Sequence, residues 1–116
     1  MSIEVELPRL LEVAGGFGTT PMLLSTDADG RPRAAATSLS WQGTVATARA
    51  GRRSLANAGE RRLVSLLWPA PPGERFALLV DGEAVRVTPD DDPREGGFVT
   101  IEVGRAILHV VGGVHA

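Results

Sequence analysis

The sequence predicts a mainly β protein, a small antiparallel barrel or sandwich of about six or seven strands with two short helices. Three observations indicate this class. Apolar and polar residues alternate in most segments after Met22, a period typical of half-buried strands. Turn residues such as Asp29-Gly30 and Gln42-Gly43 separate these segments at short intervals, as in barrels and sandwiches. Helical spacing is confined to Pro8–Ala14 and Gly51–Glu60.

The first predicted helix covers Pro8–Ala14. Leu10, Leu11 and Ala14 recur at helical spacing within it. Proline suits a first helical turn because it has no N–H to satisfy, and the glycine pair at 15–16 favours a helix end.

Three strands are expected between the two helices. Met22–Thr26 and Pro32–Trp41 are joined by a turn that contains Asp29-Gly30, a strong hairpin signal. Gln42-Gly43 then turns the chain into a third strand over Thr44–Ala48.

The second helix, over Gly51–Glu60, precedes a nearly continuous apolar run, Leu63–Trp68. We expect this run to be a strand buried on both faces. A long strand follows over Phe76–Thr88, and Gly82 within it indicates a bulge or a bend. The remaining elements are an acidic loop over 89–97 and two strands, Phe98–Val103 and Ala106–Val111, separated by Gly104.

The composition is that of an ordinary globular protein. The chain has 116 residues, of which 43% are hydrophobic and 22% are charged, so residues 1–116 are expected to form a single domain with one modest core. The net charge of -2 and the pI near 5.6 do not favour nucleic acid or an anionic membrane as partners. An anion site must therefore be a local cluster.

The chain contains no cysteine, which excludes disulfides, zinc thiolates and thiol nucleophiles. Residues 1–8 lack the basic region leading into an apolar one that marks a secretory signal. The apolar runs are far shorter than the roughly 20 residues of a membrane span. A cytoplasmic location is therefore expected.

The segment Thr47–Asn57 is the strongest candidate for chemistry. It runs from a strand through a glycine turn into a helix start, and Arg49, Arg52 and Arg53 gather there. A helix N-terminus offers free N–H groups and a partial positive charge, and guanidinium groups add forked hydrogen bonds to phosphate. The alternative is a solvated helix face whose arginines pair with Glu60 or with other carboxylates.

No self-sufficient catalytic group is visible in the sequence. His109 and His115 have no carboxylate pattern around them that would indicate a metal site. The aspartates at 90–92 lack the glycine and glutamate spacing of a calcium loop. A phosphate-binding segment without an acid–base set is typical of a protein whose cofactor carries the chemistry.

Three stretches follow one another in a recognisable order: MLLSTDADGRPRAAATSLSW, TVATARAGRRSLANAGERRLVSLLW and ALLVDGEAVRV. Together they resemble the pyridoxamine 5'-phosphate oxidase-like family of flavin-binding split barrels, over residues Leu10–Val111. The resemblance implies a six-stranded antiparallel split β-barrel that forms a homodimer. It also implies flavin mononucleotide (FMN), or alternatively a deazaflavin, in a groove between the subunits.

The resemblance further implies where the cofactor binds. Basic residues at the start of the short helix hold the phosphate, the strand before the helix lines the ring with backbone groups, and two serines of the second strand face the cofactor. The cofactor-binding residues implied in this way are Ser38, Ser40, Thr47, Ala48, Arg49, Arg52, Arg53, Ser54 and Asn57. Many family members carry a lysine where this chain has Ser54, so Arg53 would have to take its place.

The function expected from the resemblance is that of a flavin- or deazaflavin-dependent oxidoreductase acting on a small molecule that the sequence does not identify. The alternative is a non-catalytic flavin-binding or carrier module with the same fold, which the missing lysine favours. The C-terminal substrate-binding segment of the vitamin-synthesising oxidases is not apparent, so oxidation of pyridoxamine phosphate is not expected.

Overall fold

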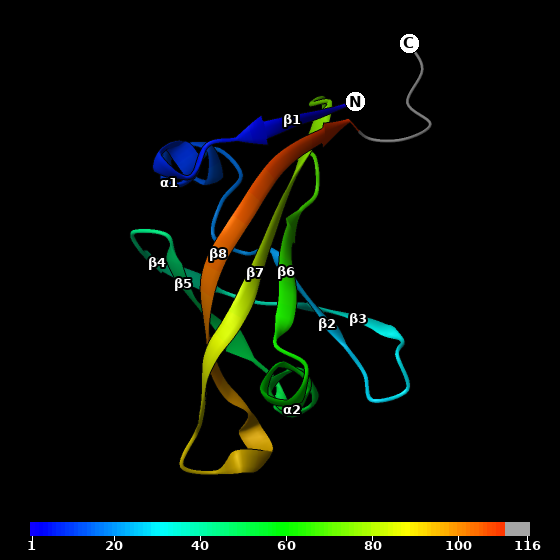
Figure 1. Cartoon of the computed structure of the whole chain (residues 1–116), viewed down its shortest axis with the longest axis vertical. Coiled ribbons are helices and arrows are strands. Elements are labelled where there is room, and N and C mark those ends of the chain that lie inside the picture. Colours follow the sequence, from blue (N-terminus) through cyan, green and yellow to red (C-terminus); the bar gives the residue numbers. More distant parts are fainter. Residues whose placement is uncertain (111–116) are drawn as a thin grey trace.

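A computed structural model describes residues 1–110, which form one curved antiparallel sheet with helices at its two ends (Figure 1). The strands are β1 (Ser2–Val5), β2 (Met22–Thr26), β3 (Pro32–Ala36), β4 (Leu39–Gln42), β5 (Val45–Ala50), β6 (Leu63–Trp68), β7 (Phe76–Pro89) and β8 (Gly97–Val110). The helices are the 3-10 turn η1 (Leu7–Arg9), α1 (Leu10–Gly15), α2 (Arg52–Glu60) and the 3-10 turn η2 (Pro93–Glu95).

The strand order explains why the sheet closes on itself. The order is β3-β2-β6-β7-β8-β5-β4, with β1 also paired to β8. The strands β3 and β4 lie at opposite ends of this order, yet Thr37 and Ser38 alone separate them along the chain. Such a short connection can be made only if the sheet curves until its two ends meet, which produces a barrel.

Two irregularities bend the long central strands. The register between β7 and β8 shifts near Gly82, where Gly104 is left without a partner, and again between Ala84 and Arg86. Bulges of this kind increase the local bend of a sheet. A Cβ atom on Gly82 would lie 2.6 Å from the Ile101 side chain, so only glycine allows the two strands to approach this closely. The bend predicted at Gly82 is confirmed.

The core fills the concave side of the sheet. Alternate residues of β5 are buried alanines, and large buried side chains come from other strands, Leu66 of β6 and Ile101 of β8 among them. Trp68 is 2% exposed, stacks on Trp41 with ring centroids 6.4 Å apart, and donates from Nε1 to the Gly18 carbonyl at 2.8 Å. These contacts place both tryptophans in the structural core, as inward-facing positions of the strands require.

The predicted fold class is confirmed, but the predicted count of six strands is wrong, because the described residues form eight. One cause is β1, which pairs with residues 106–109 of β8 and has no strong strand signal of its own. The other is the predicted strand Pro32–Trp41. It breaks in two because the Thr37 and Leu39 amides donate to Pro21 and Thr19 rather than to a neighbouring strand.

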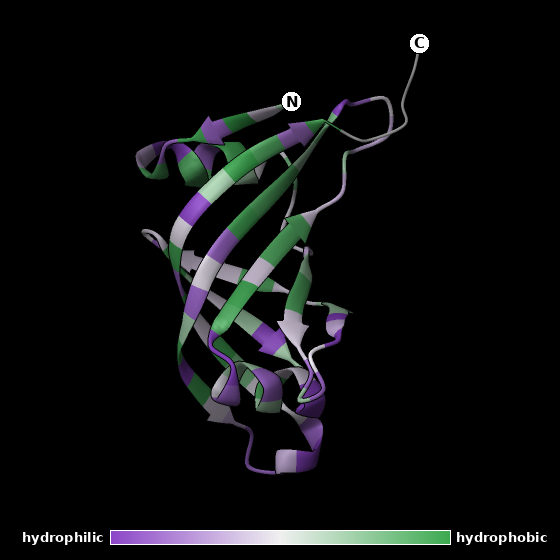
Figure 2. Cartoon of the chain, turned by 45° about the vertical axis from the view of Figure 1, so that its right-hand side comes forward, coloured by the Kyte–Doolittle hydropathy of each residue, from purple (hydrophilic) through white to green (hydrophobic). Residues whose placement is uncertain are grey.

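Two further predictions need correction. The last two predicted strands form a single strand, β8, since the bulge at Gly104 bends the chain without ending the pairing; Val111, the predicted end, lies outside the described residues. Strand β6 is mostly hydrophobic (Figure 2), but only one of its faces is buried; on the other, Ser65 and Leu67 are half-buried and Leu63 is 79% exposed. No helix within residues 1–110 is long and apolar enough to cross a membrane.

Candidate anion-binding site

The helix α2 begins with an uncapped first turn that carries two arginines. Gly51 occupies the N-cap position and has no side chain to bond the free N–H groups. Arg52 and Arg53 are the first two helical residues and both are exposed. Ser54, also among the predicted cofactor-binding residues, is buried against the core. The helix start therefore presents N–H groups and two guanidinium groups on its solvent side, an arrangement that attracts anions.

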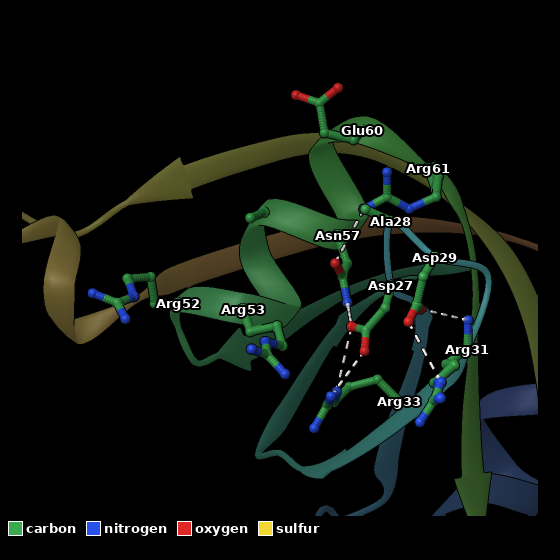
Figure 3. A pocket seen from close by; sticks show the side chains of 11 residues that line it. Asp27, Ala28, Asp29, Arg31, Arg33, Arg52, Arg53, Asn57, Glu60 and Arg61 are labelled. Carbon is green, nitrogen blue, oxygen red and sulfur yellow. Dashed lines mark hydrogen bonds and ion pairs between the residues drawn. The ribbon is translucent and has the colours of Figure 1, made fainter.

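An open depression of about 800 Å³ lies between α2 and the β2–β3 hairpin (Figure 3). Five arginines and three carboxylates line this arginine pocket. The arginines are Arg31, Arg33, Arg52, Arg53 and Arg61, and the carboxylates are Asp27, Asp29 and Glu60. Positive charge is in excess at this place, although the whole chain carries a net charge of -2.

Asp27 organises one wall of the arginine pocket. Arg33 donates from Nη2 to the Asp27 carboxylate at 2.8 Å, and Asn57 donates from Nδ2 to the same carboxylate, also at 2.8 Å. Arg61 donates to the Thr26 carbonyl at 2.6 Å and to Asn57 Oδ1 at 3.1 Å. These bonds hold the hairpin against α2. Asn57, predicted to bind the cofactor, is buried, and its amide nitrogen donates to Ser25 and Asp27 within this network.

The arginines of the pocket differ in whether a carboxylate neutralises their charge. Arg31 forms an ion pair with Asp29 at 3.4 Å, and Arg33 forms one with Asp27. Within residues 1–110, Arg52 and Arg53 take part in no ion pair or side-chain hydrogen bond. Neither residue therefore pairs with Glu60 or with another carboxylate in this part of the chain, whereas Arg49, the third arginine of the predicted alternative, does pair with a carboxylate, that of Asp90. Two guanidinium groups are available to an external anion.

The Asp27 network predicts a stability change at acid pH. Hydrogen bonds from Arg33 and then Asn57 lower the pKa of Asp27 from 3.8 to about 2. Because the folded state binds this proton less tightly than the unfolded state, the carboxylate stabilises the fold above its ordinary pKa and the gain disappears as pH falls from 3.8 to about 2. Over that range, the free energy of unfolding in urea should fall more steeply for the wild type than for Asp27→Asn. Asp29→Asn on the same hairpin is the control, and equal slopes for wild type and Asp27→Asn would contradict the network's role.

Most of the predicted cofactor-binding residues on β4, β5 and the connection before β4 lie on the outer face of the barrel. Ser40 of β4 is opposite Thr47 of β5, which is opposite Thr100 of β8, so the three hydroxyl side chains share one row on that face. Ser38 is exposed beside this row. Ala48 points the other way and is fully buried in the core.

Arg49 is tied to the acidic loop. It donates from Nη1 and Nη2 to the two carboxylate oxygens of Asp90, the first bond measuring 2.8 Å. Its guanidinium lies over the Phe98 ring, 5.0 Å from the centroid. The guanidinium of Arg49 lowers the pKa of Asp90. Arg49 is thus neutralised within the fold, unlike Arg52 and Arg53.

The segment Thr47–Asn57 supplies only the α2 half of the pocket, and the hairpin half was not predicted. Asp27, Arg31 and Arg33 flank the Asp29-Gly30 turn that the sequence identifies as a hairpin, and the structure places this turn against α2. The signal available in the sequence was the density of arginine and aspartate around that turn. Nothing local indicated which other element it would face.

Comparison by sequence finds two partial relatives of the chain. No protein-family model matches it. Two mycobacterial proteins described only as uncharacterized, one from Mycobacterium bovis and one from Mycobacterium tuberculosis, are each 41% identical to it over 61 residues. The match covers 51% of this chain, and the chain spans 41% of the length of either relative.

Solved structures match between 76% and 93% of the chain at low sequence identity. An FAD-binding protein from Mesorhizobium loti superposes with a TM-score of 0.67 and 12% identity, covering 93% of this chain and 96% of its own. An F420 reductase superposes with a TM-score of 0.64 and 15% identity, covering 76% of this chain and 88% of its own. A Listeria innocua protein described as a pyridoxamine 5'-phosphate oxidase superposes with a TM-score of 0.61 and 17% identity, covering 93% of this chain and 100% of its own. The chain therefore has the split β-barrel fold of the pyridoxamine 5'-phosphate oxidase-like proteins, as its sequence resemblance predicts.

Proposed function

We propose that the chain binds a phosphate-bearing flavin-type cofactor, FMN or a deazaflavin, and acts with it as an oxidoreductase on a small molecule. The observation that carries this proposal is the arginine pocket at the start of α2, where Arg52 and Arg53 have no ion-pair partner within residues 1–110. The names of two fold neighbours, an FAD-binding protein and an F420 reductase, support the cofactor class.

The residues present fit the phosphate end of such a cofactor. Arg52 and Arg53 supply charge-assisted donors, and the uncapped N–H groups of α2 supply further donors. Arg33 is paired with Asp27 at the opposite wall, so the positive charge available to the phosphate comes from Arg52 and Arg53. When bound, a flavin or deazaflavin supplies hydride transfer. The role of the chain is to hold the phosphate and to fix the position of the attached ring.

The hydroxyl row of Ser40, Thr47 and Thr100 is the proposed surface for the ring. Strand β5 runs into α2 through Gly51, so a molecule anchored at Arg52 can extend along the outer face of β5. Hydroxyl groups there can donate to, or accept from, the polar edge of a ring. Arg49, already bound to Asp90, would border this surface without contributing free charge.

We also propose a homodimer that is formed through the outer face of the sheet. Met22, Leu67, Leu79 and Ile107 are directly opposite one another on four adjacent strands, and all four are half-buried. A contiguous apolar row of this kind on a sheet face is typical of an interaction surface. A second copy can cover it by the same residues, as two-fold symmetric interfaces do.

Leu79→Glu is expected to convert the dimer into a monomer, because a charge at the centre of an apolar interface must be desolvated without a partner. Light scattering coupled to size-exclusion chromatography measures the change. Leu11→Glu, at an exposed position on α1, carries the same substitution away from this face and should leave the dimer intact. A wild-type monomer at micromolar concentration would refute the dimer.

Absorption spectra test the proposed function. The purified protein is titrated with FMN and with deazaflavin F420, and a perturbed, saturating spectrum is the expected result for at least one of them. The bound cofactor is then treated with a nicotinamide donor. Reduction supports the oxidoreductase. Binding without reduction supports the carrier module, which is favoured by the serine at position 54, where many members of the resembled family carry a lysine. Absence of binding refutes both.

A further inference from the structure

The helix α2 separates the arginine pocket from a second depression of different character. This depression has a volume of about 490 Å³ and lies between α2, the end of β7 and the turn η2. Its walls are largely apolar and include Leu55, Val87, Pro89 and Pro93. We call it the apolar pocket.

Three rows of residues on α2 relate the two pockets. Arg53 and Asn57, one turn apart, line the arginine pocket alone, whereas Leu55 and Gly59 line the apolar pocket alone. Arg52, Ala56 and Glu60 line both. Residues four apart lie above one another on a helix, so these last three form the ridge between the pockets.

The middle residue of this ridge, Ala56, has a short side chain, so the barrier between the two pockets is lowest there. Ala56 has only a methyl group and lies about 6 Å along the helix axis from each of its two long neighbours in the row. It is exposed, and no long side chain rises between the pockets at this point. Arg52 at one end of the ridge is positive and Glu60 at the other is negative, so an anionic group would cross nearer to Arg52.

The two pockets together suit a molecule that has a phosphate at one part and an uncharged group at another. The arginine pocket offers unpaired guanidinium groups to a phosphate, and the apolar pocket offers a hydrophobic floor to an uncharged group. Proline, valine and leucine side chains pack well against a flat heterocycle. A cofactor that ends at its phosphate, such as FMN, could use only the first pocket.

Resting on the proposed function, we infer that the cofactor continues beyond its phosphate, and that the attached apolar or heterocyclic group crosses α2 at Ala56 to lie in the apolar pocket. The class is that of phosphodiester- or pyrophosphate-linked two-part cofactors, of which a flavin dinucleotide is an example. Arg52 is placed to contact the linking phosphate from either side of the ridge.

The test compares FMN and FAD as probes on three forms of the full chain. In the wild type, FAD should bind about tenfold more tightly than FMN, because the second group buries apolar surface. Ala56→Leu places a larger side chain between the pockets and should remove this preference, so that the ratio of the FMN Kd to the FAD Kd falls from about ten to about one. Ala56→Ser, which keeps the ridge low, should retain the preference. Isothermal titration calorimetry measures each Kd.

Leucine is a strong helix former and Ala56 is exposed, so the variant is expected to fold; circular dichroism checks this, and Ala56→Gln provides a second way to raise the ridge. Equal wild-type affinities for FMN and FAD would overturn the inference and leave the proposed function standing. So would a preference for FAD that survives in both raised variants. If FMN, FAD and deazaflavin F420 all fail to bind the wild type, the proposed function is wrong and the inference falls with it; if F420 alone binds, the proposed function stands and the inference of a flavin dinucleotide is overturned.

Discussion

Replacing Arg52 and Arg53 together by alanine is expected to weaken cofactor binding by at least about 100-fold, because two charge-assisted bonds to phosphate contribute about 1.5 kcal/mol each at the low end. The effect on folding should be small, since both side chains are exposed and form no ion pair within residues 1–110. Spectral titration with the cofactor and urea denaturation of the same preparations measure the two quantities.

A matched control for this double variant is Arg75→Ala with Arg105→Ala. Both residues are exposed and neither lines the arginine pocket, so the net charge changes by the same amount outside the pocket. This control should keep its affinity within a factor of about two, because exposed charges farther away than a Debye length of about 8 Å are largely screened. Equal losses in both double variants would show that general charge, and not the pocket, governs binding.

Gly96→Ala should be among the most destabilising single substitutions in the chain. Gly96 is buried and has φ 92° and ψ -134°, a conformation that residues with a Cβ rarely adopt. An added Cβ would lie 2.1 Å from the Ala50 carbonyl oxygen and 2.9 Å from Gly51 Cα. Backbone strain and the steric clash together are expected to cost about 3 kcal/mol or more. Urea denaturation measures the loss.

The position of Gly96 also connects this loss to function. The atoms that the new Cβ would displace belong to the junction between β5 and α2, directly before Arg52. Gly73→Ala provides the comparison, because Gly73 also has a positive φ, of 82°, but open space around its Cβ position. It should cost only the conformational strain, about 1 kcal/mol. A Gly96→Ala protein as stable as Gly73→Ala would contradict the packing argument.

Several helices, strands and turns could be predicted from the sequence, because the patterns that indicate them involve only a few adjacent residues. The strands Met22–Thr26 and Leu63–Trp68 coincide with β2 and β6, since alternation and bounding turns are properties of a few adjacent residues. The helix after Gly51 and the arginines at its start were visible for the same reason. The identity of a turn, Asp29-Gly30, was visible too, because it depends on which residues tolerate a positive φ.

The partners of these elements were not visible. Arg49 bonds with Asp90, 41 residues away, and this bond removes one of the three arginines that the sequence placed together. Asn57 is occupied by Asp27 from the hairpin, and Ser54 turns into the core. Each outcome depends on how the sheet curves and on which hairpin it brings against α2. Pairings between segments far apart in sequence follow from the closed sheet as a whole, because no run of neighbouring residues carries the information about its curvature.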